Sequence, residues 1–148
     1  MCFLLYAGTT LPIPRRDWNI HAPDVSVRSI KGDEEEIRVH FSLPEVQYIG
    51  STSSCGCDFP WVSFQNGDWP ELRWNNRDAE QLASDSVNRA ALGELLRSIG
   101  ENRVELYGVW AGSYALEPAC REELSIEALL DSSFYLKERG FYTIRFRS

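Results

Sequence analysis

The pattern of apolar and polar residues predicts several strands in the first third of the chain. Residues 2–7 form an unbroken apolar run that stops at Gly8, which is typical of a strand buried on both faces near the centre of a sheet. Residues 25–28 alternate apolar and polar side chains over a shorter stretch. Residues 37–42 alternate more clearly, and residues 46–49 follow after Pro44. We therefore expect 37–42 and 46–49 to pair as a hairpin of half-buried strands.

Apolar residues then recur at the three-to-four spacing of a long amphipathic helix. Asp78 or Ser84 can cap the start of this helix, and Gly100 stands where a left-handed C-terminal cap belongs. A shorter helix is predicted over residues 126–130, after Ser125 as its cap. The expected apolar stripe of the long helix consists of Leu82, Ala83, Val87, Ala90, Ala91, Leu92, Leu95, Leu96 and Ile99.

The last third of the chain predicts a strand over residues 103–110 and a terminal hairpin. In that hairpin residues 134–137 would pair with 141–146 through a turn at Gly140. The fold class expected for residues 1-148 is a single α+β domain. It has a mainly antiparallel sheet of about six to eight strands, with one long amphipathic helix and one short helix packed on it.

Composition and charge narrow the choice of partners. The net charge of −7 disfavours a nucleic-acid partner and an anionic membrane surface, because both need a basic face. No apolar run reaches the length of a membrane span. We therefore expect a small, soluble, cytoplasmic protein whose four cysteines are reduced, with no nucleic-acid or membrane partner.

The stretch with the most unusual chemistry is Cys55-Gly56-Cys57, which follows four small polar residues. Two thiolates parted by a flexible glycine can bind one Zn²⁺, the first cofactor to consider. A zinc site needs three or four ligands, so the remainder would come from Cys2, His21, His40 or Asp58. The sequence therefore indicates a metal site formed by Cys55, Cys57 and Cys2.

Two other interpretations of Cys55 and Cys57 stay open. The pair could close a small, strained and easily reduced disulfide. Alternatively, the two thiols only fill space in a turn that Phe59-Pro60-Trp61 anchors to the core. Neither histidine is tied by sequence to a thiol, and glycine-rich phosphate loops, HExxH and GxSxG are absent from the chain, so enzymatic activity stays undecided.

An alternative function rests on the aromatic segment from Trp61 to Trp74. Its rings could bind a protein or small-molecule partner without any chemistry, although large aromatic side chains in loops also cover cores. Asn66-Gly67 predicts a tight turn inside this segment, and Pro70 would confine the second arm to a sheet edge. Arg15-Arg16, in the proline-containing loop after the first strand, could hold an anion or form a solvated turn.

Overall fold

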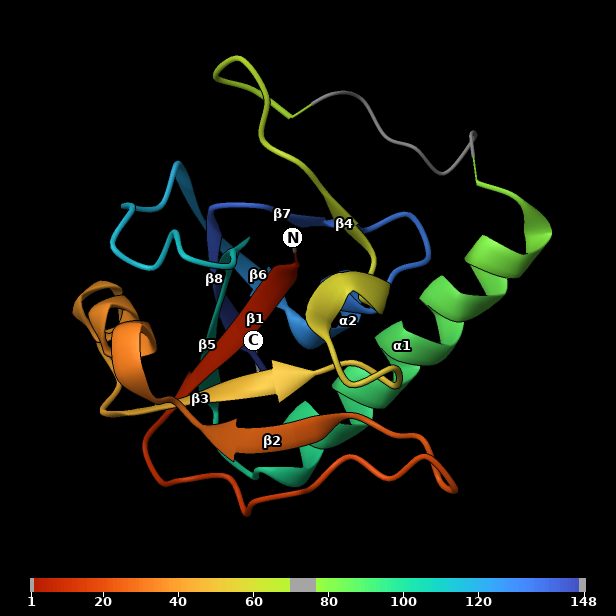
Figure 1. The fold of residues 1–148 in the computed structure, drawn as a ribbon, viewed down its shortest axis with the longest axis horizontal. Coiled ribbons are helices and arrows are strands. Elements are labelled where there is room, and N and C mark those ends of the chain that lie inside the picture. The colour runs from red at the N-terminus through yellow and green to blue at the C-terminus, as the bar shows by residue number, and fades with distance from the viewer. Residues whose placement is uncertain (1, 70–76, 147–148) are drawn as a thin grey trace.

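The computed structural model describes residues 2–69 and 77–146, and a six-stranded sheet forms its centre. The strand order is β2-β3-β1-β5-β8-β6, and each neighbouring pair is antiparallel except β6 with β8. The α+β class predicted from the sequence is confirmed (Figure 1). The six strands are β1 (Phe3–Thr9), β2 (Ser26–Ser29), β3 (Glu45–Gly50), β5 (Arg103–Trp110), β6 (Cys120–Ser125) and β8 (Gly140–Arg145).

β1 lies inside the sheet, between β3 and β5, and both of its faces are covered. Phe3, Leu5 and Ala7 belong to one apolar core, together with side chains of α1 (Ala79–Ser98) and α2 (Ile126–Leu129). Tyr6 belongs to a second core on the opposite face, under the 3₁₀ helix η1 (Gly32–His40). Burial on both faces explains why the sequence of β1 is apolar without alternation.

The long helix begins after Asp78, one of the two predicted caps, and ends before Gly100 as predicted. Asp78 and Gln81 form a reciprocal capping box at its start, and Gly100 has a φ of 77° just beyond its end. The buried face differs from the prediction in the first half, where Leu82 and Val87 are 43% and 57% exposed. Only the second half buries an apolar stripe, which consists of Leu92, Leu95 and Leu96. In the first half the buried side chains are polar: Asp85, Asn88 and Arg89.

The predicted strand over residues 37–42 is wrong, because this segment lies in η1 and in the turn after it. A 3₁₀ helix has three residues per turn, and the buried members of η1 are Glu34, Ile37 and His40, at that spacing. Val39, which a strand would have buried, is 79% exposed. β3 consequently pairs with β1 and β2, and not with residues 37–42 as predicted.

The predicted terminal hairpin is also wrong. β7 (Leu136–Lys137) pairs in parallel with β4 (Trp61–Val62), while β8 lies between β5 and β6. The left-handed residue in the connection is Arg139, with φ of 64°, and not Gly140. β6 was not predicted from the sequence. Its residues alternate between half-buried and exposed, but charged side chains occupy both kinds of position at Arg121, Glu122 and Glu123, so no apolar alternation is visible.

The predicted Asn66-Gly67 turn is confirmed. Both residues have positive φ, 52° and 80°, and Gln65 and Asp68 exchange two backbone hydrogen bonds across the turn. Pro70 and Trp74, which the sequence placed on the second arm, lie outside the described residues. In the part of the chain that the structure describes, the helices are too short or too polar to cross a bilayer.

Candidate metal centre

The fold brings three of the four cysteines together at one end of β1. Cys2 precedes β1 directly, whereas Cys55 and Cys57 lie in the loop that follows β3 and in its short 3₁₀ turn η2 (Gly56–Asp58). The three sulfur atoms all lie within 4.8 Å of one another. Antiparallel pairing of Leu5 with Ile49 places the start of β1 beside the segment that follows β3 (Figure 1). The structure thus unites thiols that are more than fifty positions apart in the chain.

Gly56 allows the loop to reach the backbone of β1. A Cβ atom at this position would overlap the carbonyl oxygen of Phe3 and lie 3.3 Å from the Cα of Leu4. No side chain can be accommodated there without moving backbone, because β1 is hydrogen-bonded on both sides. The glycine between the two cysteines therefore serves close packing on β1.

Two backbone N–H groups point at the sulfurs. Phe3 N donates to Cys57 Sγ at 3.4 Å, and Cys57 N donates to Cys55 Sγ at the same distance. N–H groups aimed at sulfur stabilise thiolate charge, and outer hydrogen bonds of this kind orient metal ligands. The N–H group of Phe3 thus opposes the effect of burial on the Cys57 thiol, because it lowers the pKa that burial raises.

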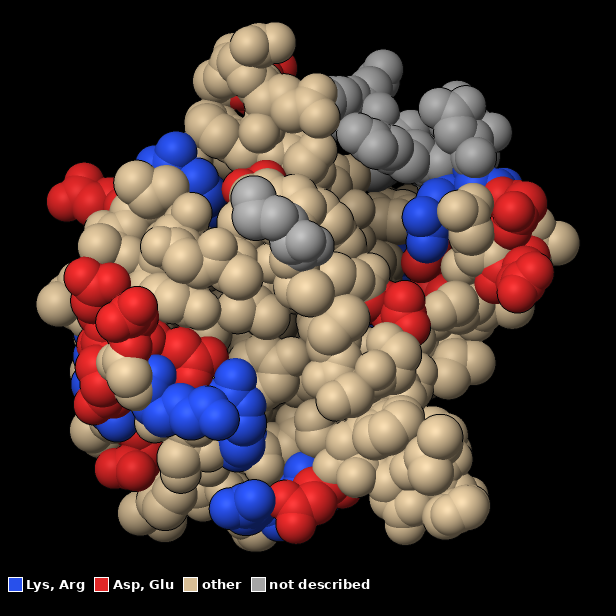
Figure 2. Space-filling model, in the orientation of Figure 1, with Lys and Arg blue, Asp and Glu red and all other residues tan. Residues whose placement is uncertain are grey.

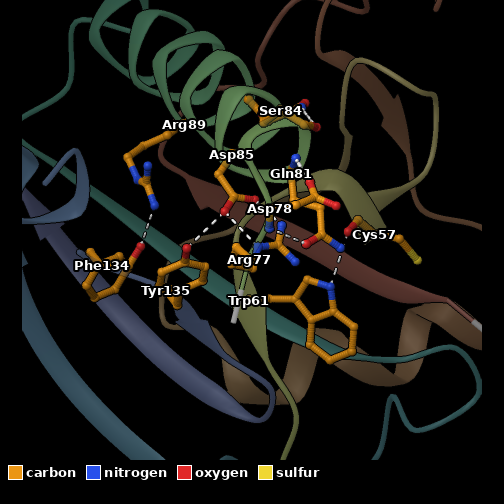
Figure 3. A network of polar contacts seen from close by, with 11 residues as sticks. Cys57, Trp61, Arg77, Asp78, Gln81, Ser84, Asp85, Arg89, Phe134 and Tyr135 are labelled. Carbon is orange, nitrogen blue, oxygen red and sulfur yellow. Dashed lines mark hydrogen bonds and ion pairs between the residues drawn. The ribbon is translucent and has the colours of Figure 1, made fainter. Parts of the chain in front are cut away.

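Side chains from other elements hold the loop in place. Asn88 of α1 accepts from Thr52 N at 2.9 Å, and Trp18 Nε1 donates to the carbonyl oxygen of Thr52 at 2.8 Å. Trp61 Nε1 donates to the carbonyl oxygen of Cys57 at 3.2 Å (Figure 3). Within the loop, Ser51 N donates to the carbonyl oxygen of Cys55 at 2.9 Å. The thiols consequently sit on a preorganised scaffold rather than on a free loop.

The polar half of α1 supports this scaffold through a buried network (Figure 3). Asp85, which is 2% exposed, binds the guanidinium of Arg77 and accepts from the hydroxyl of Tyr135 at 2.9 Å. Arg89 donates to the carbonyl oxygen of Phe134 at 2.8 Å. These contacts tie α1 to the segment between α2 and β7, so the helix that positions Asn88 is fixed by polar as well as apolar contacts.

The three cysteines of the cluster are half-buried. Burial, followed by the neighbouring thiols, raises the pKa of Cys57 to about 11. Burial also raises the pKa of Tyr48 to about 12, and the nearby Cys55 and Cys2 add to the effect. Figure 2 shows a broad uncharged surface over β1 and the loop after β3, with acidic and basic side chains gathered at its margin. Burial therefore keeps the Cys57 thiol protonated near pH 7.

The other ligands considered from the sequence do not join this group in the described part of the chain. His40 is buried in η1, where its Nε2 lies 3.0 Å from the carbonyl oxygen of Tyr114. His21 is exposed, and Asp58 follows Cys57 in η2 without reaching the cluster. Cys120 lies on β6, with two strands between it and β1. Of the four side chains considered as further ligands, Cys2 is the one that lies with Cys55 and Cys57 in the described part of the chain.

The aromatic segment packs on the protein in the part that is described. Trp61 stacks on Phe3 with ring centroids 4.7 Å apart. The ring centroids of Trp69 and Phe64 lie 5.0 Å apart, and Trp69 Nε1 donates to the carbonyl oxygen of Glu138 at 2.8 Å. Lys137 and Arg139 cover the rings of Trp69 and Phe64 respectively. These rings are half-buried and already have partners within the chain, whereas Trp74 lies outside the described residues.

The arginine pair in the loop after β1 has acidic neighbours. Arg15 Nε lies 2.7 Å from Asp17 Oδ1, and Arg16 Nη1 lies 3.3 Å from Asp24 Oδ2. The local charge is therefore balanced without an added anion.

Sequence reasoning missed the residues that orient the thiols. Asn88 was not predicted as a buried residue, because the apolar residues near it in the sequence suggested a different buried stripe. The signal that could have revealed it is spacing, since Asp85, Asn88 and Leu92 share one helical face at three-to-four intervals. The contributions of Trp61 and of Phe3 N depend on tertiary contacts that no local pattern reveals. Comparison with known protein families, with curated proteins and with solved structures gives no match.

Proposed function

We propose that this protein binds a single Zn²⁺ ion through the thiolates of Cys2, Cys55 and Cys57. The observation that carries the proposal is the convergence of three sulfurs within 4.8 Å from two separate segments. Thiolate is the ligand type that zinc favours most strongly in structural sites, and it favours soft ions such as Cu⁺ as well.

The spacing of the sulfurs suits a tetrahedral ion. Sulfurs bound at about 2.3 Å to one tetrahedral Zn²⁺ lie about 3.8 Å apart. The sulfurs lie within 4.8 Å of one another, so each pair must approach by about 1 Å or less to bind one ion. Rotation of the cysteine side chains can supply this movement. The two N–H···S contacts support the same role, because they stabilise the thiolate forms that a metal requires.

Three thiolates leave one position of a four-coordinate ion for another donor. Zinc sites with three protein ligands and an exchangeable fourth position are typical of catalytic centres, whereas closed sites with four are structural. The proposal therefore includes an exchangeable ligand such as water, and it leaves the reaction, if one occurs, undefined.

The test is metal content together with cobalt substitution. The protein should be purified under reducing conditions and analysed for bound metal, and then stripped and titrated with Co²⁺. We expect one metal per chain and a sulfur-to-cobalt charge-transfer absorption in the near ultraviolet, at an intensity expected for three thiolates.

Single cysteine-to-serine variants make the test specific. Cys2→Ser, Cys55→Ser and Cys57→Ser should each weaken binding and reduce the charge-transfer intensity. Cys120→Ser is the matched control, because its thiol lies outside the cluster, and it should bind like the wild type. Stoichiometric binding that survives in the Cys55→Ser and Cys57→Ser variants would refute the assignment.

Location and the aromatic segment complete the proposal. A cytoplasmic location accords with this proposal, because that compartment keeps cysteines reduced. All four cysteines are free, and the proposal needs three of these four as thiolates. A partner for the segment from Trp61 to Trp74 stays a prediction, and the internal contacts of Trp61 and Trp69 lend it no support.

A further inference from the structure

Three thiols this close can also react with one another. We propose that hydroperoxide oxidises the cluster to an intramolecular Cys2–Cys57 disulfide, and that this bond expels the metal ion. The first half of the inference, disulfide formation, stands on the thiol geometry alone. The second half, metal release, rests on the proposed function.

The geometry favours Cys2 and Cys57 as the pair. Phe3 N, which donates to Cys57 Sγ at 3.4 Å, is bonded directly to the carbonyl carbon of Cys2. The sulfur of Cys57 therefore lies against the backbone of Cys2, and rotation of the Cys2 side chain can close the gap. A Cys55–Cys57 bond would instead close a ring across one glycine, whose conformation is set by contact with β1.

The two-electron oxidation balances with one molecule of peroxide. A thiolate sulfur attacks one peroxide oxygen, the O–O bond breaks, and hydroxide leaves, which gives a sulfenic acid. The second thiol attacks that sulfur, the S–S bond forms, and a second hydroxide leaves. Two protons convert the hydroxides to water; they come from the thiols in the metal-free protein and from the solvent in the metal-loaded protein, whose sulfurs are already thiolates. Two thiols and one hydroperoxide thus become one disulfide and two waters.

Peroxide can reach the site, and the product cannot hold the ion. Cys2, Cys55 and Cys57 are all partly exposed residues, so the cluster lies near the surface, within reach of a small oxidant. The disulfide removes two of the three thiolates, and Cys55 alone is too few ligands for zinc. Reduction of the disulfide would restore all three donors, so binding should be reversible with the redox state.

The experiment treats metal-loaded and metal-stripped wild-type protein with one equivalent of hydrogen peroxide. Remaining thiols are then alkylated, the chain is digested, and the linked peptides are identified by mass spectrometry. A chromogenic chelator records released Zn²⁺ during the reaction. We expect both samples to lose two thiols per chain and to contain a peptide pair joined through Cys2 and Cys57. The loaded sample should release one Zn²⁺ per chain, and dithiothreitol should restore binding.

Three variants separate the alternatives. Cys55→Ser and Cys120→Ser should still form the Cys2–Cys57 link, whereas Cys2→Ser should lose it. A Cys55–Cys57 link, a link between two chains, or sulfinic acid without any link in the wild type would overturn the assignment of the pair. Zn²⁺ that stays bound after the link forms would overturn the release step. Failure of the proposed function is distinguishable, since the stripped protein would still form the link while no metal bound to the untreated protein.

Discussion

Replacing Gly56 with alanine tests whether close packing of the loop on β1 sets the geometry of the thiols. The added Cβ would overlap the carbonyl oxygen of Phe3 and lie 3.2 Å from its carbonyl carbon. Both neighbours are backbone atoms of a strand that is hydrogen-bonded on each side, so the loop must move. Relief of the overlap with the Phe3 oxygen to an ordinary contact of about 3.5–4.0 Å requires a shift of about 1.1–1.6 Å.

The size of the effect follows from that shift. Overpacking of this kind costs about 1–3 kcal/mol, and the lower entropy of unfolded alanine offsets part of it, which leaves a net loss of about 1–2 kcal/mol. Moving the loop also lengthens the 3.4 Å contact from Phe3 N to Cys57 Sγ beyond hydrogen-bond range. Loss of such an outer contact weakens metal binding by about 10- to 100-fold.

Two assays measure these quantities separately. Urea unfolding of the metal-free protein under reducing conditions gives the change in the free energy of unfolding. Competition with a chromogenic chelator gives the change in zinc affinity. The control is Gly93→Ala, whose Cβ would meet the end of the Leu130 side chain at 2.5 Å, on the α1–α2 contact. The Leu130 side chain can rotate away and alanine favours a helix interior, so this variant should change stability little and should keep its zinc affinity. If Gly56→Ala unfolds at the wild-type urea concentration and binds zinc as tightly, the packing argument is refuted.

Three further predictions concern the polar contacts. Arg77→Ala leaves the carboxylate of Asp85 buried, with Tyr135 as its remaining side-chain partner among the described residues. Urea unfolding should therefore show a loss of about 3 kcal/mol in the free energy of unfolding. An unchanged urea midpoint would show that this ion pair is dispensable. Asn88→Leu leaves Thr52 N without its acceptor, so it should lower the free energy of unfolding by about 1–3 kcal/mol and weaken zinc binding. Asn88→Asp keeps an acceptor oxygen and should weaken zinc binding less. Equal effects of the two variants would contradict the role of the amide oxygen. Burial opposes ionisation of Glu34, but its hydrogen bonds from Arg28 and Tyr6 prevail and hold its pKa below the ordinary value. Its contribution to stability is therefore fully present above the unfolded-state pKa of about 4.3 and is lost as the pH falls below it. Glu34→Gln should remove that part of the acid sensitivity, and identical pH profiles for variant and wild type would refute the assignment.

The local sequence determined the elements whose signals are contained within a few residues. The cap at Asp78, which was one of two predicted candidates, the left-handed cap at Gly100 and the Asn66-Gly67 turn all depend on neighbouring positions, and each occurs in the structure. The apolar run of β1 likewise indicated a central strand, because a strand buried on both faces needs no polar alternation. Two thiols separated by glycine indicated where unusual chemistry would lie.

Tertiary structure decided which segments meet. Alternation over residues 37–42 resembles a strand, yet burial at every third residue, which depends on what η1 packs against, makes the segment a 3₁₀ helix. The local sequence also gave no sign that β8 would pair with β6, or that residues 136–137 would pair with β4 in a separate sheet. The same applies to the cluster: the sequence offered Cys2 as one of four possible ligands, and the antiparallel register of β1 with β3 selected it. Such pairings depend on contacts between residues far apart in the chain, and a local pattern of side chains carries no information about those distances.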